Sequence, residues 1–180
     1  MLKPEQRKTL LQIARSSIES VLNGVRPELN ADGLDADLRR PSGAFVSLHK
    51  NGHELRGCIG SIQAVHPLYQ AVASSAVNAA FRDPRFVPLQ RSELTQVHIE
   101  ISVMSPIVMA VPDDIEVGRD GIIISRGRYA GLLLPQVATE YGWDRDTFLS
   151  QTCVKAGLPP DAWRNLDCKI ERFSAEVFGE

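Results

Sequence analysis

The sequence predicts a mixed α/β fold built from β-hairpins and helices. Three features carry this prediction: apolar residues at helical spacing, stretches in which apolar and polar residues alternate, and turn signals between adjacent strands. The chain has 180 residues, 43% of them hydrophobic, which is enough to bury the core of one domain. Because no flexible linker or low-complexity segment interrupts it, we expect residues 1–180 to form a single domain.

The elements begin with an amphipathic helix that starts at Pro4 and stops at Gly24. Residues 25–43 then lose periodicity and gather Pro, Gly, Asn and Asp, which is typical of an irregular connection. The length of this connection is unusual for a compact domain. We therefore expect it to wrap the surface or to border a site.

A β-hairpin follows in AFVSLHKNGHELRGCIGSI, residues 44–62, where Asn51-Gly52 separates two alternating runs. A two-residue turn would pair Lys50 with His53 and would place Phe45 opposite Cys58. One face is then aliphatic and the other polar. The predicted aliphatic face holds Ala44, Val46, Leu48, Leu55, Gly57 and Ile59, and the predicted polar face holds Phe45, Ser47, His49, Glu54, Arg56 and Cys58.

The second half of the chain alternates helices and strands. Residues 67–81 read as a helix rich in small residues, and residues 97–104 alternate as a half-buried strand. A second hairpin turns at residues 126–128, and its continuous apolar runs predict strands that are covered on both sides. Further elements are predicted at Pro135 (a short helix), after Asp144 (a capped helix) and at residues 167–178 (a closing strand).

Charge and composition exclude several classes of protein. Twenty basic and 22 acidic side chains leave a formal net charge of -2, which gives no net attraction to nucleic acid and disfavours sequence-independent DNA binding. The first ten residues carry charges where a secretion signal is apolar, and no apolar run approaches the roughly 18 residues of a membrane helix, so we expect a cytoplasmic protein. The three cysteines lack CxxC spacing and the four histidines lack HExxH spacing, so we expect no metal site.

Cys58 is the first candidate for chemistry. Arg56 lies two residues earlier on the same strand, which places both side chains on one side of the sheet about 7 Å apart. A guanidinium at that position favours the thiolate over the thiol. Gly57 and Gly60 would let backbone N–H groups approach an anion, or they mark a bulge or tight packing around an inert cysteine. The sequence leaves both interpretations open.

Other polar residues have two interpretations each. Glu100 fits a general base or a partner for Arg56, and it also fits a solvated strand face. In the turn DPRF, Arg85 beside Asp83 offers a planar fork for a carboxylate or phosphate, or it forms a surface salt bridge. Gln136 lies in a first helical turn, where free N–H groups attract anions, or it simply starts a helix. An undistorted hairpin would keep His49 too far from Cys58 for a hydrogen bond.

Six stretches carry a resemblance to the AMMECR domain family, whose bacterial and archaeal members are called AmmeMemoRadiSam system protein A. They are LRGCIGS at 55, AFRDPRF at 80, ELTQVHIEISVMSP at 93, GRDGIIIS at 118, GLLLPQVATEYGWDRDTFL at 131 and CVKAGLPPDAW at 153. The family often has Thr where this chain has Ser61, a change that keeps the hydroxyl. The resemblance implies a fold of two unequal lobes, with β-hairpins, mixed sheets and flanking helices around a cleft. It also implies a genetic association with a Memo-like protein and a radical S-adenosylmethionine enzyme, and no established reaction or cofactor.

Two functional hypotheses follow. In the first, the protein is an enzyme or part of one, with Cys58 as nucleophile, Arg56 holding charge and Glu100 moving a proton. Residues expected to bind an anionic small molecule or a modified substrate are Gly57, Gly60, Ser61, Asp83, Arg85 and Gln136. In the second, the same surface belongs to a binding or scaffold module, recognising a peptide, a cofactor or a nucleic-acid element without doing chemistry.

Overall fold

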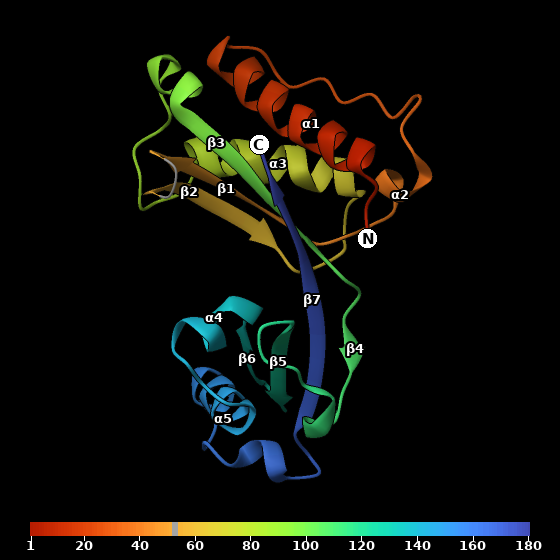
Figure 1. Cartoon of the computed structure of the whole chain (residues 1–180), viewed down its shortest axis with the longest axis vertical. Coiled ribbons are helices and arrows are strands. Elements are labelled where there is room, and N and C mark those ends of the chain that lie inside the picture. Colours follow the sequence, from red (N-terminus) through yellow and green to blue (C-terminus); the bar gives the residue numbers. More distant parts are fainter. Residues whose placement is uncertain (52–53) are drawn as a thin grey trace. The chain divides into compact units, whose positions relative to one another are not determined.

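A computed structural model describes residues 1–51 and 54–180 (Figure 1). The chain combines helices with antiparallel strands and divides into two compact units. The first unit comprises Met1–Met104 with Glu176–Glu180, and the second comprises Ser105–Ala175. Every strand pair whose register is described is antiparallel, so "mixed" applies to the combination of helices and sheets and not to strand direction.

The first unit is a sheet with helices on one face, in the strand order β2-β1-β3-β7. Helix α3 packs on β1 and β2, and α1 packs on α3 and reaches β3 (Figure 1). Its elements are α1 (Pro4–Leu22), α2 (Ala36–Arg39), β1 (Ala44–Lys50), β2 (Glu54–Ser61), α3 (Leu68–Phe81), the 3₁₀ helix η1 (Arg91–Gln96), β3 (Val97–Met104) and the end of β7 (Lys169–Gly179). Helix α2 interrupts the connection that the sequence predicts to be irregular.

The core of the first unit follows from strand alternation. Val46 and Leu48 on β1 and Ile101 on β3 are fully buried against the helices, whereas their neighbours Ser47 and Glu100 are only half-buried. The aliphatic face meets α1 and α3 through Leu10, Ala14, Ile18, Val72, Ala76 and Ala79. The small residues in which the sequence of α3 is rich allow this close approach.

The second unit packs its own core between β5, β6 and α5. Its elements are β4 (Val108–Met109), η2 (Pro112–Asp114), β5 (Asp120–Arg126), β6 (Tyr129–Leu133), α4 (Pro135–Glu140), α5 (Arg145–Lys155), η3 (Ala162–Arg164) and the first part of β7. The Asp144 side chain caps α5 by accepting from Thr147 N, as predicted. The prediction that the hairpin strands are covered on both faces is wrong, because Ile123 is only half-buried between the buried Ile122 and Ile124.

None of the helices within residues 1–51 and 54–180 combines the length and the apolar character that crossing a membrane requires.

The first hairpin has a different register from the one the sequence predicts. The predicted partner of Lys50, His53, lies outside the described residues, and Lys50 pairs instead with Glu54. A β-bulge follows between Leu48 and His49, where Arg56 is the extra residue that has no partner on β1. Beyond the bulge, Cys58 lies opposite Ser47 and not opposite Phe45.

These two one-residue offsets act in the same direction, so together they restore the predicted alternation beyond the bulge. Gly57 therefore still faces the helices and Cys58 still faces the polar side, as predicted. Between the turn and the bulge the faces are exchanged. Leu55 pairs with His49 and is exposed, so its predicted place on the aliphatic face is wrong.

Gly57→Ala tests the close approach of β2 to α3. A Cβ at Gly57 would lie 2.2 Å from the Ala79 carbonyl oxygen, which is backbone and cannot rotate away. We expect the free energy of unfolding to fall by ~3 kcal/mol, measured by urea denaturation. Gly24→Ala is the control: it has open space but a φ of +74°, so it should cost only ~1 kcal/mol. Equal losses in the two variants would contradict tight packing at Gly57.

Candidate functional site

Cys58 belongs to a row of polar side chains that crosses three strands of the first unit. Ser47 on β1 is the register partner of Cys58 on β2 and of Glu100 on β3. The Ser47 hydroxyl donates a hydrogen bond to Cys58 Sγ at 3.2 Å. All three residues are half-buried, on the face of the sheet opposite α1 and α3. The sulfur is therefore neither sealed in the core nor freely exposed.

His49 joins this row because of the bulge. Without the bulge the Lys50–Glu54 register would place Cys58 opposite Val46, on the helix-covered face, whereas it now lies opposite Ser47, two residues from His49. The His49 Nε2 atom lies 3.8 Å from Glu100 Oε1. It is buried and has no hydrogen-bond partner among the described residues. An imidazole, a carboxylate, a hydroxyl and a thiol thus share one patch, which we call the Cys58 face (Ser47, His49, Cys58 and Glu100).

Arg56 does not belong to the Cys58 face, which corrects the prediction that the two side chains project to the same side. As the extra residue of the bulge, Arg56 breaks the alternation between Leu55 and Gly57. Its guanidinium binds Glu93 through Nε and Nη2, both at 3.0 Å, and Nη2 also donates to Val87 O at 2.9 Å. Glu93 also binds Lys50, which alternates with Leu48 on the helix-covered face.

Glu93, and not Glu100, is therefore the carboxylate partner of Arg56. The Arg56 side chain is only 10% exposed, and that of Glu93 18%. The hydrogen bonds from Arg56, followed by that from Lys50, lower the pKa of Glu93 to about 2, against the opposing effect of burial. The charge of Arg56 is therefore compensated within the protein, and its role in the structure is to hold the bulge.

Asp83 and Arg85 bind the backbone of Cys58 at the open edge of the sheet. Asp83 Oδ2 accepts from Cys58 N at 2.9 Å, and Arg85 Nη2 donates to Cys58 O at 3.3 Å. Arg85 also binds both oxygens of Asp83, at 3.0 and 2.7 Å, and this holds the pKa of the Asp83 carboxyl well below its usual range. The Arg85 guanidinium is thus paired with the Asp83 carboxylate, which agrees with the salt-bridge interpretation.

Gly57 and Gly60 are explained by packing. A Cβ at Gly57 would clash with α3, and one at Gly60 would lie 2.3 Å from Ala44 O. Gly60 and Ser61 do line a hollow of about 270 Å³ together with His66 and Asn78, but Cys58 is not among its lining residues. The Ser61 hydroxyl accepts from Gln63 N at 3.0 Å. The sequence did not single out Ser47, Glu93 or Asn78, because no local pattern distinguishes them from solvated polar residues.

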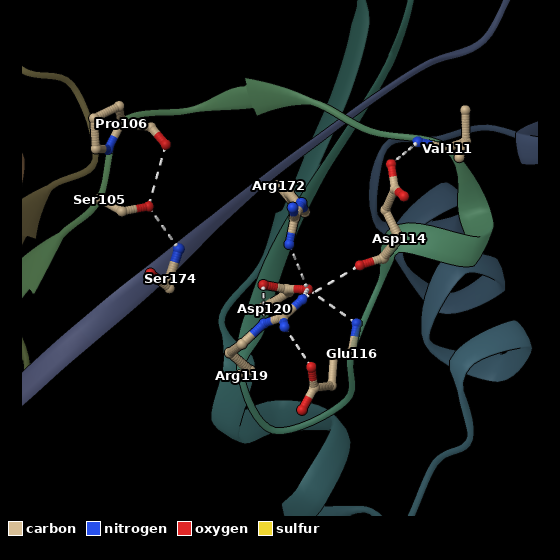
Figure 2. Close-up of polar contacts among 9 residues, drawn as sticks. All are labelled: Ser105, Pro106, Val111, Asp114, Glu116, Arg119, Asp120, Arg172 and Ser174. Atoms are coloured by element: carbon tan, nitrogen blue, oxygen red, sulfur yellow. Dashed lines mark hydrogen bonds and ion pairs between the residues drawn. The ribbon is translucent and has the colours of Figure 1, made fainter.

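The second unit holds one predicted residue and one polar cluster. Gln136 is exposed in the first turn of α4, where its carbonyl accepts from Thr139. Figure 2 shows the cluster around Asp120, whose buried carboxylate accepts from Arg119 Nη2 at 2.7 Å, from Glu116 N at 2.9 Å and from Arg172 Nη1 at 3.4 Å. The hydrogen bonds from Arg119 hold the pKa of Asp120 below its usual range, although burial opposes this.

Within residues 1–51 and 54–180, no three His, Cys, Asp or Glu side chains gather closely enough to hold a metal ion. Cys153 is fully buried in the core of the second unit, and burial raises the pKa of its thiol to about 11. Cys168 packs against that core. Cys153 is thus a core residue, whereas Cys168 is only half-buried.

Comparison with known proteins identifies the family. The model of the AMMECR1 family matches residues 11–178. The chain belongs to the AMMECR1 family. Its relatives include a protein of Thermococcus onnurineus, 43% identical over 99% of this chain and 92% of the relative, and a protein of Methanothermobacter thermautotrophicus, 44% identical over 99% and 96%.

A solved structure shows the same AMMECR1 fold. The crystal structure of an uncharacterized protein from Pyrococcus horikoshii is 40% identical, with a TM-score of 0.84 that covers 99% of this chain and 93% of the other. The family resemblance in the sequence is therefore confirmed for the family and for the fold. This likeness identifies the family and the fold and assigns no role to the residues of the Cys58 face.

Glu93→Gln tests the ion pair that holds the bulge. Because the folded-state pKa of Glu93 lies below its ordinary value of 4.5, its stabilising effect is complete above pH 4.5 and is lost as the pH falls toward about 2. In urea denaturation, we expect the free energy of unfolding of the variant to be ~3 kcal/mol lower than that of the wild type at pH 7. The difference should be smaller at pH 3. The exposed Glu28→Gln is the control, and an equal loss at both pH values would contradict this assignment.

Asp83→Ala tests the edge contact at Cys58. Without the carboxylate, the Cys58 N–H loses its acceptor at the sheet edge, so its hydrogen exchange should speed up by about tenfold or more. Amide exchange followed by NMR measures this directly, with the buried Ile124 of the second unit as internal reference. Unchanged protection at Cys58 would show that the contact does not persist in solution.

Proposed function

We propose that the protein is an enzyme, or a component of one, that uses Cys58 as a nucleophile on an anionic small molecule or a modified substrate. The observation that carries this proposal is the row Cys58, Ser47 and Glu100, in which the sulfur accepts a hydrogen bond from Ser47 at 3.2 Å. A nucleophile oriented by a hydrogen bond, with a base nearby, is the arrangement that covalent catalysis requires.

His49 and Glu100 are the proton carriers of this proposal. One buried imidazole nitrogen has no hydrogen-bond partner among the described residues and lies 3.8 Å from the carboxylate, a separation that a small rotation closes to a hydrogen bond. Glu100 would orient and charge-balance His49, and His49 would accept the proton that leaves Cys58. Arg56 would act as a positioning residue that holds the bulge, since its guanidinium is bound to Glu93.

The cellular setting of the proposal comes from the family resemblance. We place the activity in the cytoplasm, beside a Memo-like protein and a radical S-adenosylmethionine enzyme. The Cys58 face would then take or deliver a small molecule within that system, and neither a membrane nor nucleic acid is part of the proposal.

A non-catalytic binding module is the second candidate, favoured by one observation. The forks of Arg56 and Arg85 are both occupied by carboxylates of the chain itself, and Gly57 and Gly60 are both explained by packing. Much of the LRGCIGS and AFRDPRF motifs thus has a structural role. In this alternative, Cys58→Ser would leave function intact.

Alkylation of the wild-type protein, followed by mass spectrometry of each cysteine, tests the proposed nucleophile. We expect Cys58 to react ~10-fold faster than Cys168 in the same sample near neutral pH. Glu100→Gln and His49→Gln should shift the pH dependence for Cys58 and leave that for Cys168 unchanged.

The matched control is Glu54→Gln, which removes an exposed carboxylate from β2 outside the Cys58 face. It should leave the alkylation profile of Cys58 unchanged. If Cys58 reacts no faster than Cys168, and its pH profile is unchanged in the His49 and Glu100 variants, the enzyme proposal is rejected. The binding module is then the remaining candidate.

A further inference from the structure

A hollow of about 520 Å³ lies along the outer face of α3 in the first unit. The helix and its flanks contribute one stripe at intervals of three and four residues, from His66 to Arg82. The opposite wall comes from the chain just after α1, with Arg26, Pro27 and Leu29. This wall belongs to the connection that the sequence predicted to wrap the surface or to border a site.

The lining of this hollow, which we call the α3 hollow, is positively charged. Arg26 and Arg82 both line it, His66 adds an imidazole, and no Asp or Glu is among its lining residues. The chain as a whole carries a net charge of -2, so this local excess of positive charge is not a property of its general composition. A concave surface lined by one sign of charge concentrates ligands of the opposite sign.

Arg26 and Arg82 also differ from most arginines of the first unit. Five others form ion pairs with carboxylates of the protein: Arg7, Arg15, Arg40, Arg56 and Arg85. Within the described residues, neither Arg26 nor Arg82 has such a partner, and Arg82 makes only a 3.5 Å hydrogen bond with Asn78 Oδ1. Two guanidinium groups therefore remain available to a ligand at the same hollow.

The hollow beside Asp120 in the second unit shows the contrast. It also contains two arginines, Arg119 and Arg172, but the buried Asp120 binds both of them and Glu116 pairs with Arg119. Its charges are thus balanced within the protein. The α3 hollow, in contrast, has no carboxylate among its lining residues.

The remaining lining fits an organic ligand. Gln70, Ser74 and Asn78 offer amide and hydroxyl groups, and Ala73 and Val77 with Pro27 and Leu29 provide apolar surface. A volume of about 520 Å³ lies in the range typical of small-molecule sites. His66, Ser74 and Asn78 also line the smaller hollow at Gly60 and Ser61, so the two hollows adjoin.

We infer that the α3 hollow binds a phosphorylated small molecule with an apolar part, a site separate from the Cys58 face. Two guanidinium groups match the two negative charges of a phosphate monoester better than the single charge of a carboxylate, and arginine forms bidentate hydrogen bonds with phosphate oxygens. Pro27, Leu29 and Val77 contact the apolar part. The Cys58 face lies on the opposite side of the sheet and takes no part in this binding.

Titration of the isotope-labelled full-length chain with phenyl phosphate, followed by NMR, tests this inference. We expect saturable shifts confined to residues 26–29, 60–61 and 66–82. Arg26→Gln and Arg82→Gln should each weaken binding by about tenfold. Arg39→Gln is the matched control, because it removes an exposed arginine of the same unit that has no described carboxylate partner and does not line the hollow.

Each outcome decides the inference. Absence of saturable shifts, or an equal weakening by Arg39→Gln, would overturn the site. Benzoate binding as tightly as phenyl phosphate would overturn the phosphate assignment, and inorganic phosphate binding as tightly would overturn the apolar contact. Cys58→Ser should leave the affinity unchanged, so loss of the thiol chemistry and loss of this site are observed separately.

Discussion

The ion pair between Arg56 and Glu93 is the interaction on which the arrangement of the first unit depends. Arg56 is the one residue of β2 that has no partner on β1. Its ion pair with Glu93 neutralises the Arg56 charge, which would otherwise lie unpaired at the helix-covered side of the sheet. Because this extra residue is accommodated, Cys58 lies opposite Ser47 and two residues from His49. The polar face owes its composition to a contact on the other side of the same sheet.

Strand alternation and helix spacing were enough to predict the elements and most of their faces, because these features depend on neighbouring residues. The pairing of β1 with β2 could not be predicted in the same way. The bulge depends on Glu93, which is 37 residues from Arg56 along the chain, and no local pattern reveals that contact. The face of Cys58 was nevertheless correct, since the one-residue offsets at the turn and at the bulge add to two residues, which leaves the alternation unchanged. Leu55, which lies between them, was misplaced for the same reason.

Two of the stretches that carry the family resemblance are distant in the sequence but meet at one peptide unit. Asp83 and Arg85 of AFRDPRF bind the amide and the carbonyl of Cys58 in LRGCIGS. The sequence offered a nucleophile and an anion-binding fork as separate features, and the structure joins them through the backbone. Arg56 and Arg85 are therefore occupied, whereas Arg26, outside these stretches, and Arg82, within AFRDPRF, have no carboxylate partner among the described residues.

The Asp83–Arg85 pair also bears on how copies of the chain behave toward one another. An outer strand with unpaired backbone groups is a template on which another extended chain can add, and natural proteins block such strands with charged residues. In the middle of β2, the Asp83 carboxylate accepts a hydrogen bond from the amide of Cys58, and the Arg85 guanidinium donates one to its carbonyl. Strand-by-strand growth from that border is thereby interrupted, and the protection persists in mildly acidic surroundings because Asp83 stays ionised there.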